Sequence, residues 1–131
     1  MYEVHGWFGL AESVEVGDAG GLSVAVRDLG HMLRENEWMN LSISIVPLNG
    51  QYFLNITGAF NRRRAEAIFI DDVLEYVRER LPGSWGLLYE RDDESAEPDV
   101  KNVFRVKVLA RGRLTRQIDP FLSPCVPTIE D

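Results

Sequence analysis

The sequence predicts an α+β fold with a largely antiparallel sheet of about five strands and two amphipathic helices, in the order βαββαββ. Three observations support this prediction. Several stretches alternate apolar and polar residues with the period of two that is typical of a strand. Two others space their apolar residues three or four apart, which is typical of a helix packed on one side. The pair Asn49-Gly50 lies between two alternating stretches and favours a tight hairpin of antiparallel strands.

The first strand is expected over residues 2–10, where an apolar side alternates with a mostly polar one. The apolar side consists of Tyr2, Val4, Phe8 and Leu10, and the other side of Glu3, His5 and Trp7. After the glycine-rich stretch 17–21, a helix is expected at about residues 22–37. Its apolar stripe is Leu22, Val26, Leu29 and Leu33. One such stripe predicts that the helix buries a single face.

The hairpin and the second helix follow. The two strands of the hairpin are expected at residues 41–45 and 51–57, on either side of the turn. Asn61 is expected to cap a helix that ends at Leu81, since Pro82-Gly83 cannot continue it. The apolar stripe of this helix is Ala65, Phe69, Val73, Tyr76 and Val77.

Two further strands and an extended arm complete the chain. One strand contains Trp85, Leu87 and Tyr89, and the other runs from Val103 to Ala110. An acidic loop is expected between them. From Asp119 onward, Pro120, Pro124 and Pro127 exclude a regular helix or a central strand. Because this segment also contains several apolar residues, we expect a proline-rich arm that packs on the domain.

The length and composition predict one globular domain over residues 1–131. Hydrophobic residues make up 45% of the chain and charged residues 27%, values close to those of ordinary soluble domains. No apolar run reaches the ~18 residues of a membrane span, and the first residues lack the features of a signal peptide. Cys125 is the single cysteine, so no internal disulfide can form. We therefore expect a cytoplasmic protein without a membrane partner.

The charge of the chain favours basic partners. Twenty-one acidic residues against fourteen basic ones give a formal net charge of −7, which repels nucleic acid. Residues 90–99 hold six acids and one base, whereas residues 100–116 hold six bases and no acid. The two segments are interpreted as solvated faces or as segments that partly neutralise one another across a hairpin.

Nothing in the sequence assembles a nucleophilic catalytic centre. Ser84 lies in Gly83-Ser84-Trp85-Gly86, which is better explained as a turn that enters a strand than as a nucleophile elbow. Cys125, between prolines in an apolar segment, is expected to pack as a small hydrophobic residue. His5 and His31 are too few for a zinc site without carboxylates, and no glycine loop suited to phosphate is present, so no cofactor is expected.

Asp92, Asp93 and Glu94 leave one catalytic alternative open. Clustered carboxylates are the ligands that Mg²⁺ and Ca²⁺ prefer, so the chain could be a small metal-dependent hydrolase. The cluster lacks the alternate spacing and the glycine of a typical cation loop, which favours the prediction that there is no metal site.

Two further features have both a structural and a functional explanation. Residues 62–64 are three arginines at the start of the second helix, where the helix dipole disfavours cations, so they are expected to pair with acidic residues or to contact a partner. Trp7, Trp38 and Trp85 are expected to pack in the core. If Trp7 or Trp85 faces solvent, an interface becomes the better explanation, because tryptophan is common in binding hot spots.

Three segments in order resemble the immunity protein 7 family of bacterial polymorphic toxin systems. They are Tyr2-Glu3-Val4-His5-Gly6-Trp7, then Gly83-Ser84-Trp85-Gly86-Leu87-Leu88-Tyr89 followed by Asp92-Asp93-Glu94, and Asp119-Pro120-Phe121-Leu122-Ser123-Pro124-Cys125. The resemblance implies a non-enzymatic α+β protein that binds the C-terminal catalytic domain of a cognate toxin, which is often a nuclease. It also implies protection of the producing cell and its kin.

The sequence then gives a hypothesis for the site. The charged part of a one-to-one toxin interface is expected at Tyr89, Glu90, Asp92, Asp93 and Glu94, with Trp7 or Trp85 as an aromatic anchor. The family motif residues His5, Gly6, Asp119, Pro120 and Pro124 can equally be structural. A third alternative is a structural adaptor that dimerises through an exposed sheet edge.

Overall fold

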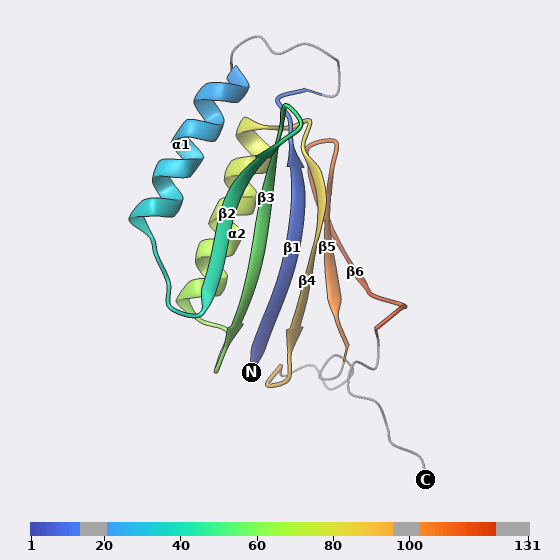
Figure 1. Cartoon of the computed structure of the whole chain (residues 1–131). Helices are drawn as coiled ribbons and strands as arrows, with labels where there is room; N and C mark the ends of the chain where they lie inside the picture. The colour runs from blue at the N-terminus through green and yellow to red at the C-terminus, as the bar shows by residue number, and fades with distance from the viewer. Residues whose placement is uncertain (14–20, 96–102, 123–131) are drawn as a thin grey trace.

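A computed structural model describes residues 1–13, 21–95 and 103–122 of the chain. In these residues, six antiparallel strands form one sheet, and two helices pack against one of its faces (Figure 1). The elements are β1 (Tyr2–Leu10), α1 (Gly21–Glu35), β2 (Leu41–Leu48), β3 (Gln51–Phe60), α2 (Ala65–Arg80), β4 (Trp85–Asp92), β5 (Arg105–Ala110) and β6 (Arg113–Ile118). The strand order across the sheet is β2-β3-β1-β4-β5-β6. The predicted α+β class with a largely antiparallel sheet is confirmed.

The N-terminal strand β1 lies inside the sheet, between β3 and β4. Its predicted alternation is confirmed, because Tyr2, Val4, Phe8 and Leu10 are buried whereas His5 and Trp7 are exposed. The register places Phe8 beside Leu54 of β3 and beside Gly86 of β4. The apolar side of β1 therefore forms the centre of the core.

Two hairpins have the same kind of turn, but the sequence predicted only one of them. Asn49 and Gly50 have φ values of 52° and 75°, as the predicted hairpin requires. Arg111 and Gly112 have φ values of 53° and 70° and join β5 to β6. The expectation of about five strands is thus wrong, and the sheet has six. Strand β6 was missed because nearly all its side chains are exposed and because arginine is uncommon at positive φ.

The helices bury the apolar stripes that the sequence predicted, with two corrections at the start of α2. In α1, Val26 and Leu29 are buried. In α2 the buried residues are Ala67, Phe69, Ile70, Val73, Leu74 and Val77, whereas Ala65, which was assigned to the stripe, is exposed. The expected cap at Asn61 is also wrong, because the helix begins after Arg64, which makes no capping side-chain bond. Residues 61–64 form bends before the helix.

The two faces of the sheet differ in what covers them. The face under the helices carries Leu54, Ile56 and Leu88 in the core. The opposite face, which the described helices leave uncovered, carries Trp7, Thr57 and Tyr89 (Figure 1). Strand β5 follows the same division, since its valines lie on the uncovered face and its basic residues lie on the helix side.

The acidic segment was expected to be a loop, but β4 extends through Asp92, and only Asp93 and Glu94 form the turn that follows it. The proline-rich arm is described only as far as Leu122, so Cys125, Pro124 and Pro127 lie outside the described residues. Neither described helix combines the length and apolar character needed to cross a membrane.

Candidate functional site

Two tryptophans stand side by side on the uncovered face of the sheet. Trp7 on β1 is 47% exposed and Trp85 on β4 is 46% exposed. Their rings meet edge to face, with the centroids 5.8 Å apart and the planes at 77°. A Cβ atom added to Gly9 would lie 2.6 Å from Cε2 of Trp85, so the indole of Trp85 rests directly on the backbone of β1. The glycine thus allows the two rings to meet.

The side chains around the tryptophans are uncharged. The row across the sheet through Trp7 is Ser44, Asn55, Trp7, Leu87, Val108 and Thr115. The neighbouring row through Trp85 is Val46, Phe53, Gly9 and Trp85. We call these two rows the tryptophan face. Its apolar centre and large half-exposed rings are the composition of a protein interface core, where charged residues are depleted and tryptophan is enriched.

Glu3, His5 and Arg91 lie at one end of this side of the sheet, and Arg113 of β6 lies on the same side toward the other end. His5 Nε2 is 2.7 Å from Glu3 Oε2, and Arg91 donates to Glu3 Oε1 at 3.2 Å. The hydrogen bond with His5, together with Arg91, lowers the pKa of Glu3 below 4.5. Phe104 packs against His5 and Tyr89, at centroid distances of 6.4 and 6.1 Å. These groups therefore border the tryptophan face without entering it.

Glu90, which the sequence assigned to the interface, points to the helix side of the sheet. Its side chain is 9% exposed, and its Oε2 accepts a hydrogen bond of 2.5 Å from the hydroxyl of Tyr2. Its Oε1 lies 3.4 Å from Nζ of Lys107. Tyr89, the preceding residue, faces the other side. Sequence neighbours on a strand alternate between faces, so Glu90 and Tyr89 cannot share one contact surface.

The other three acids each have a separate partner. Asp92 Oδ1 accepts a hydrogen bond of 3.1 Å from the backbone N–H of Glu94. The N-terminal ammonium group donates a hydrogen bond to Asp93 and forms an ion pair with it. This contact lowers the pKa of Asp93. Glu94 Oε2 lies 3.7 Å from Nε of Arg62. Among the described residues, no group of three or more His, Cys, Asp or Glu side chains is arranged to hold a metal ion.

Two of the three arginines before α2 pair with acidic residues. The pair between Arg62 and Glu94 confirms the expectation that this segment pairs with the acidic one. Arg63 donates to Asp71 at 3.1 Å and lies over the ring of Tyr2, with its Cζ 5.8 Å from the ring centroid. Both contacts are local to the helix-side corner of the sheet.

Several motif residues have structural contacts that account for their residue types. A Cβ atom added to Gly6 would lie 2.6 Å from Cδ1 of Leu88. The side chain of Leu88 on the neighbouring strand therefore occupies the space that a larger residue would need. Asp119 is buried, and its Oδ2 accepts hydrogen bonds from the N–H groups of Phe121 and Leu122 at 3.1 and 2.5 Å. The exposed Pro120 lies within this turn.

Ser84 also has a structural contact. It is buried, and its Oγ accepts a hydrogen bond of 3.0 Å from the N–H of Ala11. The hydroxyl thus ties the start of β4 to the end of β1, in keeping with its interpretation as part of a strand entry.

Sequence reasoning missed the buried ionic network at this corner. Lys107 is 1% exposed, and its Nζ lies 2.8 Å from Asp71 Oδ1 and 3.4 Å from Glu90 Oε1. Burial and the adjacent Glu90 carboxylate raise the pKa of Tyr2. The members of this network are distant in sequence, and only the alternation of residues 104–108, which puts Arg105 and Lys107 on one side, gave a signal.

These features define a layered α+β protein whose uncovered sheet face has the composition of a protein-binding surface. The whole chain, residues 1–131, matches the model of the immunity protein 7 family, and the protein belongs to that family. The predicted resemblance is therefore confirmed. No curated protein and no solved structure in the comparison matches the chain. Membership of an immunity protein family is consistent with neutralisation of a toxin and with a non-enzymatic role.

Proposed function

We propose that this protein binds and neutralises the C-terminal catalytic domain of a cognate polymorphic toxin in the cytoplasm, as a one-to-one complex. The family match over the whole chain is the observation that carries this proposal. Binding protects the producing cell and its kin by keeping the toxin domain inactive. The protein itself acts without catalysis.

The tryptophan face is the proposed contact surface. Trp7 and Trp85 each expose nearly half of their area in the free protein, which leaves apolar surface in contact with water. Covering this surface with a partner removes it from water, at a gain of roughly 25 cal/mol per Å² of apolar area before the costs of association. The surrounding uncharged rows can be buried without leaving a charged group unpaired.

The acidic residues have a different role in this proposal. Glu90 is excluded from the interface because it is buried on the helix side. Asp93 and Glu94 are exposed in the turn after β4 and contribute to the negative field of a chain with net charge −7. Such a field accelerates encounter with a basic partner more than it strengthens the final complex.

Co-expression tests the function directly. The toxin C-terminal domain encoded immediately upstream is expressed with and without this protein, growth is scored, and the complex is purified. We expect growth rescue and a stable one-to-one complex. Persistent toxicity in the presence of folded protein, with no complex, would overturn the proposal for that pair. Self-association of the chain through a sheet edge, without toxin binding, would favour the adaptor alternative.

A further inference from the structure

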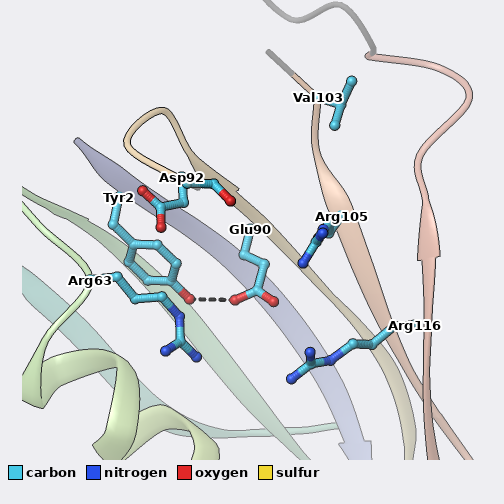
Figure 2. Close-up of a pocket in the computed structure, with 8 residues that line it drawn as sticks. Tyr2, Arg63, Glu90, Asp92, Val103, Arg105 and Arg116 are labelled. Atoms are coloured by element: carbon cyan, nitrogen blue, oxygen red, sulfur yellow. Dashed lines mark hydrogen bonds between the residues drawn. The ribbon is translucent and has the colours of Figure 1, made fainter. Parts of the chain in front are cut away.

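The sheet ends at β2 on one side, and this edge strand belongs to an uncharged hairpin. Residues 38–61, which include β2 and β3, contain no Asp, Glu, Lys, Arg or His. Natural edge strands are commonly protected from pairing with other chains by charged side chains. The opposite edge has such charges, since β6 carries Arg113 and Arg116, and Figure 2 shows the Arg116 side chain directed toward the space around Glu90. The β2 edge therefore lacks a protection that the β6 edge has.

The register determines which backbone groups of β2 point away from the sheet. The two-residue turn at Asn49-Gly50 makes Leu48 and Gln51 a hydrogen-bonded pair, and such pairs recur at every second residue of the hairpin. The hydrogen bond of 3.2 Å from the N–H of Ala59 to the carbonyl of Asn40 agrees with this alternation. The residues between these pairs direct their N–H and C=O groups toward the open edge.

The outward-directed residues define a short stretch that is open to pairing. Leu41, at one end, is already bridged by Trp38. Pro47, at the other end, has no N–H to donate. Ile43 and Ile45 lie between these limits, and no residue in the described part of the chain bonds to their outward backbone groups. The N–H and C=O groups of both isoleucines are therefore available to one extended segment.

A pocket beside this edge adds a place for a side chain. It has a volume of about 380 Å³ and is lined by residues of α1, α2, β2 and the connection between α1 and β2. The apolar residues of its lining include Leu33, Trp38, Ile43 and Phe69. Every second side chain of a strand paired with β2 would point to the helix side. One such apolar side chain can enter the pocket.

We propose that the β2 edge pairs with an extended, uncharged segment of the cognate toxin domain, which adds a strand to the sheet. This inference rests on the proposed function and names the kind of segment that the toxin contributes. Ser44 of β2 belongs to the tryptophan face and lies two strand spacings, about 10 Å, from Trp7. A standard interface covers about 800 Å² of each partner, which is enough to reach from the tryptophans to this edge.

A second copy of the chain fits this edge less well. Helix α1 contacts β2 and lies along the same margin of the sheet (Figure 1). Paired strands are about 4.8 Å apart, whereas packed helices need about 8 to 10 Å between their axes. Two copies paired antiparallel at this edge would therefore crowd their α1 helices. A toxin strand without such a helix avoids the conflict.

Amide hydrogen exchange tests the pairing directly. Exchange is measured by nuclear magnetic resonance on the isotope-labelled full chain, alone and with the unlabelled toxin domain encoded immediately upstream. We expect the Ile43 and Ile45 amides to exchange about tenfold more slowly or less in the complex, because toxin carbonyls accept their hydrogen bonds. The amides of Leu114 and Arg116, which point outward from the β6 edge, are the internal controls and should change little.

A matched pair of proline variants tests the contribution of this edge to affinity. Ile43→Pro removes an outward N–H and a partly buried side chain from β2, and Leu114→Pro makes the same kind of change in β6. We expect toxin binding to weaken about tenfold in Ile43→Pro and to change little in Leu114→Pro, as measured by calorimetry. If a proline variant does not fold, the exchange pattern of the wild type decides.

The possible results separate this inference from the proposed function. A complex in which the Ile43 and Ile45 amides exchange as in the free chain would overturn the inference and leave the immunity function standing. The absence of any complex would overturn both. Slow exchange of the two amides in the free monomer would assign the edge to another segment of this chain, and slowing that increases with the concentration of the free chain would assign it to a second copy. Either result would overturn the pairing with the toxin, as would equal losses of affinity in the two folded proline variants.

Discussion

The indole rings of Trp7 and Trp85 meet edge to face on the sheet surface that the helices leave uncovered, with their centroids 5.8 Å apart. The contact joins β1 to β4, and Gly9 makes it possible by letting the ring of Trp85 lie on the backbone of β1. An edge-to-face pair holds both rings in fixed positions before any partner arrives. A preorganised aromatic surface loses less entropy on binding than one whose side chains must first be ordered.

The tryptophans are expected to dominate toxin affinity. Trp7→Ala and Trp85→Ala should each weaken binding by about 2 kcal/mol or more, which is about thirtyfold, because both rings lie at the centre of the proposed contact. Isothermal titration calorimetry with the purified toxin domain measures this. Thr115→Ala, in the same row at the sheet edge, is the control and should change affinity little. Unchanged affinity in both tryptophan variants, with growth rescue intact, would move the interface elsewhere and leave the immunity function standing.

Gly9→Ala tests the positions of the rings without removing either of them. The added methyl group would overlap the indole of Trp85 and force it to move. We expect altered near-ultraviolet circular dichroism and an affinity loss of about tenfold, equal to about 1.4 kcal/mol. A near-ultraviolet spectrum identical to that of the wild type would show that the indole of Trp85 has kept its position, and would contradict the prediction.

The acids at the end of β4 are expected to affect the rate of association. The double variant Asp93→Lys with Glu94→Lys should slow toxin binding about tenfold at low salt, and the difference should shrink as salt screens the field. Surface plasmon resonance at several salt concentrations measures the rates. The control is Asp72→Lys with Glu79→Lys, which changes the net charge equally on exposed positions of α2. An equal effect of both variants would show that the association rate depends on the net charge of the chain and not on the position of Asp93 and Glu94.

The buried ionic network is expected to stabilise the fold. Lys107→Met keeps the bulk of the side chain but leaves Glu90 without its cation in a buried position. The free energy of unfolding should fall by about 3 kcal/mol, at the low end for a broken buried pair because Asp71 is partly exposed and can be solvated. Urea unfolding measures this. Adding Glu90→Gln to the variant should recover part of the loss, and a double variant as unstable as the sum of two independent losses would contradict a direct pair.

Glu3 makes stability depend on pH in the acidic range. Its pKa is lowered from 4.5 by the hydrogen bond with His5 and by Arg91, so the charged form is favoured in the folded state. The stabilisation is complete above about pH 4.5 and is lost as the pH falls through the lower folded-state pKa. The Glu3 side chain is 26% exposed and its partner His5 is 48% exposed, so we expect only about 0.5 kcal/mol. Melting temperatures of wild type and Glu3→Gln should therefore differ near neutral pH and converge as the pH falls through the folded-state pKa of Glu3, whereas a difference that is constant with pH would exclude this role.

Much of the fold was predictable because it depends on local patterns. The alternation in residues 2–10 predicted β1 and its buried side, and Asn49-Gly50 predicted the hairpin of β2 and β3. Strand β6 was not predictable in the same way. Strand β6 lies at the edge of the sheet and buries few of its side chains. Its sequence therefore shows no alternation of apolar and polar residues from which a strand could be predicted. Its turn uses Arg111 at positive φ, where asparagine or glycine would have given the usual signal.

The candidate site was predictable only in part, because it depends on which face a side chain occupies. Trp7 and Trp85 were recognised as residues whose exposure would indicate an interface, and the structure exposes both. Glu90 was grouped with its acidic neighbours, although its burial depends on Tyr2 and Lys107, which are remote in sequence. Charge clustering along the chain does not reveal that alternate residues of a strand separate onto two faces.

The division of the sheet into two faces also bears on how such a protein can diversify. Along β1 and β4, every second side chain packs under the helices, and the residues between them face outward. Outward residues can therefore be exchanged without repacking the interior. If the proposed contact surface is the one that recognises the toxin, a lineage that meets a new toxin can change that surface at alternate positions of a constant backbone. New specificity would then leave the packing of the core unchanged.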